Sequence, residues 1–158
     1  ARVLSTDESF IINTGLIMEH IVIEIAVQEL HALKDFLKAI KEERDSIISF
    51  SLEGITRGNN RKEEILRKIE YLECEKNRLI EELSDPDSIF KSEKWMHLSH
   101  ETRTVMKEIN ESLEKNMKLL SFSMDHLKGS IENIMGFINN TAYLNKKTRV
   151  SLFPSREI

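Results

Sequence analysis

The strongest fold signal in this chain lies in residues 105–138, which read VMKEINESLEKNMKLLSFSMDHLKGSIENIMGFI. A large apolar residue returns every three or four positions, which is the period of an amphipathic α-helix. These positions are Val105, Ile109, Leu113, Met117, Leu120, Met124, Leu127, Ile131, Ile134 and Ile138. Burial of each such side chain contributes roughly 1.5–3 kcal/mol. This face must therefore be covered, either by the chain's own helices or by a partner.

The composition favours a helical protein. Of 158 residues, 32% are charged, 6% are aromatic and two are proline, which is typical of a helical bundle or coiled coil. The net charge of −4 is spread over interleaved signs, so the chain offers no basic face to nucleic acid. A single cysteine, Cys74, cannot form an internal disulfide, and we expect a reduced, cytoplasmic setting.

The region before the main register predicts two further helices, over about residues 16–52 and 61–83. The apolar run 21–27 is β-branched and could be a strand, but we assign it to the first helix because no second strand exists to pair with it. Polar residues interrupt the apolar stretch 10–27, so it does not predict a membrane span. Gly58 is expected to end the first segment and Pro86 to follow the second helix.

The third helix is expected over about residues 100–139, longer than the second, so its apolar face should outlast the cover that its neighbours provide. The connection 84–98 contains Trp95 and is interpreted either as a plug over one end of the bundle or as a contact surface. The predicted fold is all-α, an elongated antiparallel bundle of three long helices within residues 1–140. A flexible C-terminal tail, residues 141–158, is expected to follow it.

The sequence offers no catalytic constellation. His97 and His100 have helical spacing, but two ligands do not make a metal site, and Cys74 lies between glutamates that disfavour its thiolate. The glycines form no phosphate-binding loop. We therefore predict a protein that is not an enzyme and that needs no cofactor or metal.

Two features of the third helix point to contacts. Gly129 and Gly136 lie seven residues apart, which indicates either close contact with another helix or tolerated flexibility. Asn116 falls among apolar neighbours, where a buried amide would set the register of packing.

Three segments in order carry a family resemblance over about residues 25–145. They contain Leu30, Leu33, Leu37 and Glu42-Glu43-Arg44, then Lys62, Ile65-Leu66, Ile69 and Asn77-Arg78-Leu79-Ile80, then Leu113, Asn116 and Leu119-Leu120. In these segments the chain resembles the FlgN type of flagellar export chaperone. The resemblance implies a cytoplasmic helical chaperone that binds the amphipathic C-terminal helix of hook–filament junction subunits and keeps them unassembled before type III export.

The resemblance also implies site residues. Client binding maps to Leu120, Met124, Leu127, Ile131, Ile134 and Ile138. A tail tyrosine is linked in the family to docking at the export gate, and Tyr143 occupies the like position, followed by Leu144 where the family often has glycine.

One alternative function remains open at this point. The apolar stripe could be covered permanently by identical chains, which would make the protein a structural homo-oligomeric coiled coil with no client. Even for a chaperone, the client-free chain must hide this face, and a homodimer is one way to do so.

Overall fold

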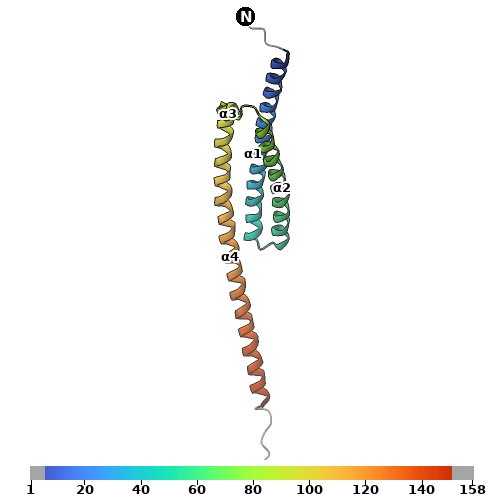
Figure 1. Cartoon of the computed structure of the whole chain (residues 1–158). Coiled ribbons are helices and arrows are strands. Elements are labelled where there is room, and N and C mark those ends of the chain that lie inside the picture. Colours follow the sequence, from blue (N-terminus) through green and yellow to red (C-terminus); the bar gives the residue numbers. More distant parts are fainter. Residues whose placement is uncertain (1–5, 151–158) are drawn as a thin grey trace, which may run out of the picture. The chain divides into compact units, whose positions relative to one another are not determined.

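The computed structural model describes the backbone of residues 6–150 and the side chains of residues 14–141. Four helices account for most of this range: α1 (Thr6–Ile48), α2 (Leu52–Glu82), α3 (Pro86–Phe90) and α4 (Glu93–Val150) (Figure 1). No strand occurs in residues 6–150. The prediction of an all-α protein with three long helices is therefore confirmed.

The chain divides into two compact units, with the boundary between Met117 and Lys118. The first unit holds α1, α2, α3 and the beginning of α4. The second holds the remainder of α4.

The core of the first unit lies where three helices meet. Leu33, Leu37 and Ile40 of α1 form a buried cluster with Val105 and Ile109 of α4. Further members of this cluster are Leu30 and Phe36, and the partly buried side chains packed against it are Ile65, Ile69, Leu98 and Leu113. The first part of the apolar face found in residues 105–138 therefore lies in the core, as its period predicts.

Ion pairs give the relative direction of α1 and α4 in this unit. Lys34 Nζ lies 2.6 Å from Glu101 Oε1, and Lys41 Nζ lies 3.9 Å from Glu108 Oε2. Both partners advance by seven residues from the first pair to the second, so α1 and α4 run parallel. The helix that joins them in the chain, α2, runs antiparallel to both (Figure 1).

The turn between α1 and α2 lies at residues 49–51, not at residues 53–60 as the sequence suggested. Ser51 donates its N–H to Ser46 O at 2.9 Å and Phe50 donates to Ile47 O at 3.1 Å, the paired bonds of a Schellman motif. Phe50 adopts the left-handed conformation, φ 54°, that this motif requires at its position. Ser51 Oγ then accepts the Gly54 N–H at 3.1 Å and caps α2.

Gly58 lies inside α2, so its interpretation as a helix end was wrong. A Cβ on Gly58 would lie 3.3 Å from the Cβ of Glu43, and a Cβ on Gly54 would collide with the Ser46 side chain. The two glycines are present because α1 and α2 approach closely there, and this packing need outweighs their poor helix propensity.

The far end of the first unit is closed by the connection that precedes α4. Ile89 of α3 is buried with Val22 and Leu83, and Trp95 packs against this cluster. The plug interpretation of this segment is confirmed, although the segment is helical. The Ser92 Oγ accepts the Trp95 N–H at 3.2 Å, so α4 begins at Glu93 and not near residue 100.

At its other end α4 runs to Val150, so residues 141–150, for which the sequence predicts a flexible tail, are helical. Residues 137–153 contain neither Gly nor Pro, and without such a residue the helix has no local reason to end at 139. Residues 151–158 of the expected tail lie outside the described residues. Among the described residues, no helix is long and apolar enough to cross a membrane.

Candidate partner-binding surface

The second unit carries one continuous apolar surface on α4. We call it the apolar strip, and its residues are Leu120, Met124, Leu127, Ile131, Ile134, Met135 and Ile138. At about 100° per residue, these seven positions fall within an arc of about 100°. Every position of residues 118–141 that falls in this arc is apolar. The strip is therefore as wide as the face that an ordinary helix buries against a core.

The strip is open to solvent along its length. Six of its seven side chains are 51–68% exposed, and Leu120 is half-buried. Soluble proteins commonly expose single apolar side chains, but a contiguous row of this kind marks an interaction surface.

The sequence predicted six of these residues, all except Met135. The structure places the six on one face of one helix, as their spacing required, and leaves five of them exposed. Their role in client binding stays a prediction. Met106, Met117, Met124 and Met135 of this helix are together predicted to be either core filler or a surface that repacks against partners. Met135 is outside the client-binding set, because the three–four register passes through Ile134 and Ile138, although it borders the same arc.

Two large side chains beside the strip were also missed. Phe122 is 71% exposed and Phe137 is 73% exposed, and both lie outside the arc of the strip. No apolar period marks them, because both fall outside the three–four register, Phe122 between two serines and Phe137 between Gly136 and Ile138. Their size and exposure are the only signals that could have identified them.

A buried polar network holds α4 to α1 just before the second unit begins. Asn116 is 3% exposed and donates through Nδ2 to Ile40 O at 2.9 Å and to Glu43 Oε2 at 3.1 Å. Its Oδ1 accepts from Arg44 Nε at 2.9 Å, and Arg44 Nη2 donates to Ser112 O at 3.2 Å. The predicted burial of Asn116 is confirmed, whereas its effect on register stays a prediction.

The network extends to α2 through a buried ion pair. Lys62 Nζ lies 2.8 Å from Glu43 Oε2, and both side chains are largely buried. No buried side-chain nitrogen or oxygen among the described residues lacks a hydrogen-bond partner. Since all its groups are satisfied, the hydrogen bonds and the ion pair offset the desolvation cost of burying them, and the network can fix the position of α4 on α1.

An ion pair between Lys34 and Glu101 also joins α1 to α4, nearer the start of α4. Lys34 donates a hydrogen bond to Glu101, and this bond lowers the pKa of the Glu101 carboxyl, with the Lys34 charge acting in the same direction. Glu29 and Lys76 form a comparable pair between α1 and α2. The Lys34–Glu101 pair is partly exposed, whereas the Lys76 and Glu29 side chains are only 16% and 13% exposed.

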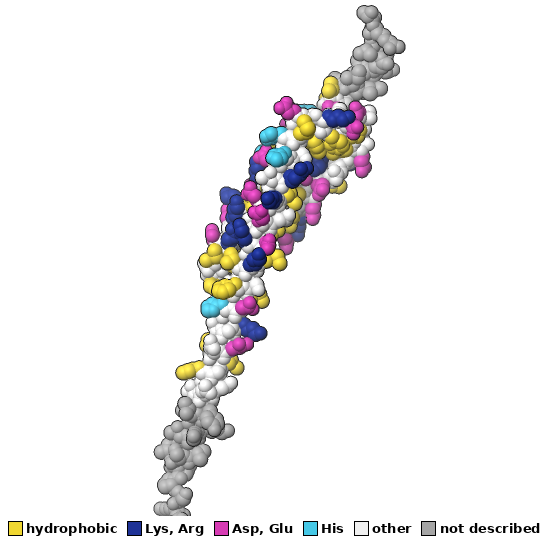
Figure 2. All heavy atoms as spheres, turned by 90° about the vertical axis from the view of Figure 1, so that its left-hand side faces the viewer, with side chains coloured by type: hydrophobic (Ala, Val, Ile, Leu, Met, Phe, Trp, Pro, Cys, Tyr) yellow, Lys and Arg dark blue, Asp and Glu magenta, His cyan; other side chains and the backbone are white. Residues whose placement is uncertain are grey.

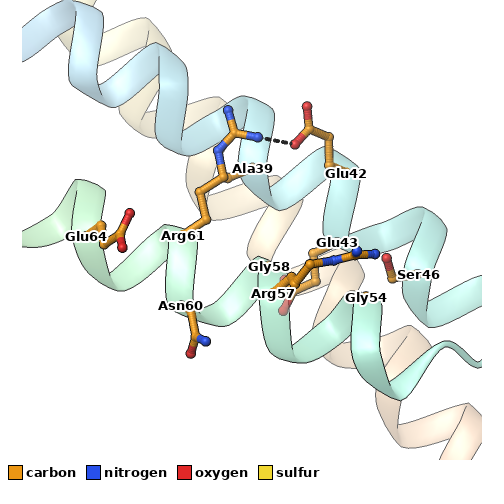
Figure 3. A pocket seen from close by; sticks show the side chains of 10 residues that line it. All are labelled: Ala39, Glu42, Glu43, Ser46, Gly54, Arg57, Gly58, Asn60, Arg61 and Glu64. Atoms are coloured by element: carbon orange, nitrogen blue, oxygen red, sulfur yellow. Dashed lines mark hydrogen bonds and ion pairs between the residues drawn. The ribbon is translucent and has the colours of Figure 1, made fainter.

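A polar hollow of about 520 Å³ lies between α1 and α2 (Figure 3). Arg61 reaches across it from α2 and pairs with Glu42 at 2.6 Å, as the dashed line in Figure 3 shows. Glu43 is held by Lys62. The hollow lies where Gly54 and Gly58 place no side chain between α1 and α2, and its Glu42 and Glu43 carboxylates pair with Arg61 and Lys62.

The histidine, glycine and tyrosine positions singled out in the sequence lie at separate places on α4. His97 Nδ1 lies 3.9 Å from Glu101, and no three His, Cys, Asp or Glu side chains gather as metal ligands within the described residues. A Cβ on Gly129 or Gly136 would meet no atom of the described residues within 4 Å. Tyr143 lies within α4, but its side chain falls outside the described ones, so its docking role stays a prediction.

Comparison with known proteins gives one result. The family model described as FlgN protein matches residues 18–150, which span nearly all of the helical part of the chain. No curated protein and no solved structure matches the chain.

Proposed function

Because the chain belongs to the FlgN family of flagellar export chaperones, we propose that its apolar strip binds the amphipathic C-terminal helix of hook–filament junction subunits. The bound helix cannot pair with its own kind while it is covered, so the subunit stays unassembled until type III export. The protein acts in the cytoplasm by binding, without catalysis and without a cofactor.

The exposure of the strip is the observation that carries this proposal. At roughly 100 Å² for each half-exposed Leu, Ile or Met, the strip offers on the order of 700 Å², close to what one partner contributes to a standard interface. A single amphipathic helix with anchors at three–four spacing fits a surface of this length and width. The strip therefore has the size of a helix-binding site.

The proposal is tested by placing a charge within the strip. Leu127→Glu and Ile131→Glu should abolish binding of purified junction protein in isothermal titration calorimetry, because a partner helix would bury the new carboxylate. Asn139→Glu, which adds the same charge about 90° away from the centre of the strip, should bind normally. If Leu127→Glu loses its helical circular dichroism, Leu127 is ordinary core and the proposal fails.

The competing proposal is that the protein is a structural homo-oligomer without a client. The strict three–four spacing of apolar residues from Leu120 to Ile138 favours this alternative, because such spacing forms the seam of a coiled coil. Light scattering separates the two. A chaperone should shift to a complex with one copy of each protein when client is added. A structural coiled coil should resist dilution and ignore the client. Client-free chaperone can form a homodimer through the same strip, but the client should dissociate it.

We further propose that Tyr143 takes part in docking at the export gate. Tyr143→Ala should then leave client affinity unchanged while export of the junction proteins falls. Unchanged export would remove this role.

A further inference from the structure

A single charged side chain borders the apolar strip. Within residues 118–141, the residues with a formal charge are Lys118, Asp125, Lys128 and Glu132. At about 100° per residue, Lys128 lies about 70° from the centre of the strip, whereas the other three lie about 110–150° from it. Figure 2 shows how few charged side chains the visible face carries near the lower grey atoms. Of these four charges, only Lys128 is placed to contact a helix that lies on the strip.

Lys128 lies near the middle of the length of the strip, directly after Leu127. In a helix whose apolar residues alternate in steps of three and four, this is an edge position, from which a long side chain reaches the partner helix. The Lys128 side chain is exposed, and among the described residues no ion pair joins it to Asp125 or Glu132 on its own helix. Its ammonium group is therefore available to a partner.

A second copy of this chain offers Lys128 no carboxylate at the facing edge position. If two strips pair in parallel, Lys128 faces the opposite edge of the other copy, where Ser123 stands. If two strips pair antiparallel in the register that matches the strip with itself, Lys128 faces Lys128 of the other copy. Self-pairing therefore either leaves this charge without an opposite charge or places a like charge against it, which favours a foreign helix as the occupant.

We propose that Lys128 determines specificity at the apolar strip, by pairing with an Asp or Glu that the client helix carries beside its own apolar face. The strip alone accepts any helix with apolar residues at three–four spacing, so it does not distinguish one such helix from another. A carboxylate opposite Lys128 adds an attraction that self-pairing lacks, and a Lys or Arg there is repelled. This inference rests on the proposed function, because it concerns the same client helix on the same strip.

Two charge reversals provide a matched test. Lys128→Glu is compared with Lys118→Glu, which makes the same change in net charge about 150° from the centre of the strip. The affinity of each full-length chain for purified junction protein is measured by calorimetry at about 50 mM and about 1 M salt. We expect Lys128→Glu to weaken binding at least about fivefold at low salt and less than about twofold at high salt, because salt screens the charges. Lys118→Glu should change the affinity less than about twofold at both.

A compensating change in the client identifies the partner carboxylate. Each Asp or Glu beside the apolar face of the client's C-terminal helix is changed singly to Lys, and binding to the Lys128→Glu chain is measured at low salt. We expect one of these client variants to bind the Lys128→Glu chain at least about fivefold more tightly than the unchanged client does. Such a rescue requires the two side chains to interact, which a purely structural role of Lys128 does not provide.

Three results would overturn the inference: equal affinities of the Lys128→Glu and Lys118→Glu chains, a loss at Lys128→Glu that persists at high salt, or no client variant that restores binding. Leu127→Glu, measured in parallel, separates this inference from the proposed function. If Leu127→Glu abolishes binding while Lys128→Glu binds normally, the proposed function stands and the inference about Lys128 fails. If a helical Leu127→Glu chain binds the client normally, the proposed function itself fails.

Discussion

Substitution of Asn116 by Ala should cost about 3 kcal/mol of unfolding free energy. The side chain makes three hydrogen bonds, to Ile40 O, Glu43 and Arg44, and each contributes about 0.5–1.5 kcal/mol net. The loss stays near the sum of these contributions, because Glu43 keeps its bond to Lys62 and Arg44 keeps its bond to Ser112 O. Neither charge is therefore left without a partner.

Urea unfolding followed by circular dichroism measures this loss. Ser112→Ala is the matched control, since Ser112 is equally buried but contributes its backbone carbonyl to Arg44, which the substitution retains. We expect the control to lose less than about 1 kcal/mol. A loss below about 1 kcal/mol for Asn116→Ala would refute the view that this network holds α4 on α1.

Three further predictions concern the packing and charge of the first unit. Gly54→Val should destabilise the protein by roughly 1–3 kcal/mol in the same assay, because its side chain would collide with Ser46 where α1 and α2 touch; an unchanged midpoint would show that the helices can separate. Phe50→Gly should stabilise it by up to about 1 kcal/mol, because glycine adopts the left-handed conformation without strain, and a destabilised variant would contradict this. The pKa of Glu101 is lowered by Lys34, so the stability that this pair adds is present above the unfolded-state pKa and lost as the pH falls through the folded-state pKa; Glu101→Gln should remove this acid dependence, and an identical pH profile would disprove it.

The helices were predictable because their signal is local. Each apolar register repeats within a single segment, and a period of three to four residues defines one face whatever lies opposite. The same argument identified the strip residues from Leu120 to Ile138, whose common face depends only on helical geometry.

The helix ends were less predictable because the residues that mark them have two uses. Gly58 can end a helix or allow a close approach, and only the position of Glu43 on another helix decides between these. Ser92 and Ser99 are both plausible caps, and the choice of Ser92 depends on how Trp95 packs against the end of the bundle.

The burial of Asn116 could be anticipated, but its partners could not. Ile40, Glu43 and Arg44 lie more than 70 residues away in the sequence, and no local pattern pairs them with one amide. The exposure of Phe122 and Phe137 could not be predicted from the sequence either, because neither residue belongs to a repeating apolar pattern that would assign it to a helix face.

The most direct test of the client-binding strip is the accessibility of one of its residues. Leu127→Cys is introduced into a chain in which the exposed Cys74 is replaced by Ser, and the rate of thiol labelling is measured in dilute free protein and with saturating junction protein. We expect rapid labelling of the free chain and strong protection in the complex. Labelling that is slow already in the dilute free chain, or equally rapid with and without junction protein, would contradict the account.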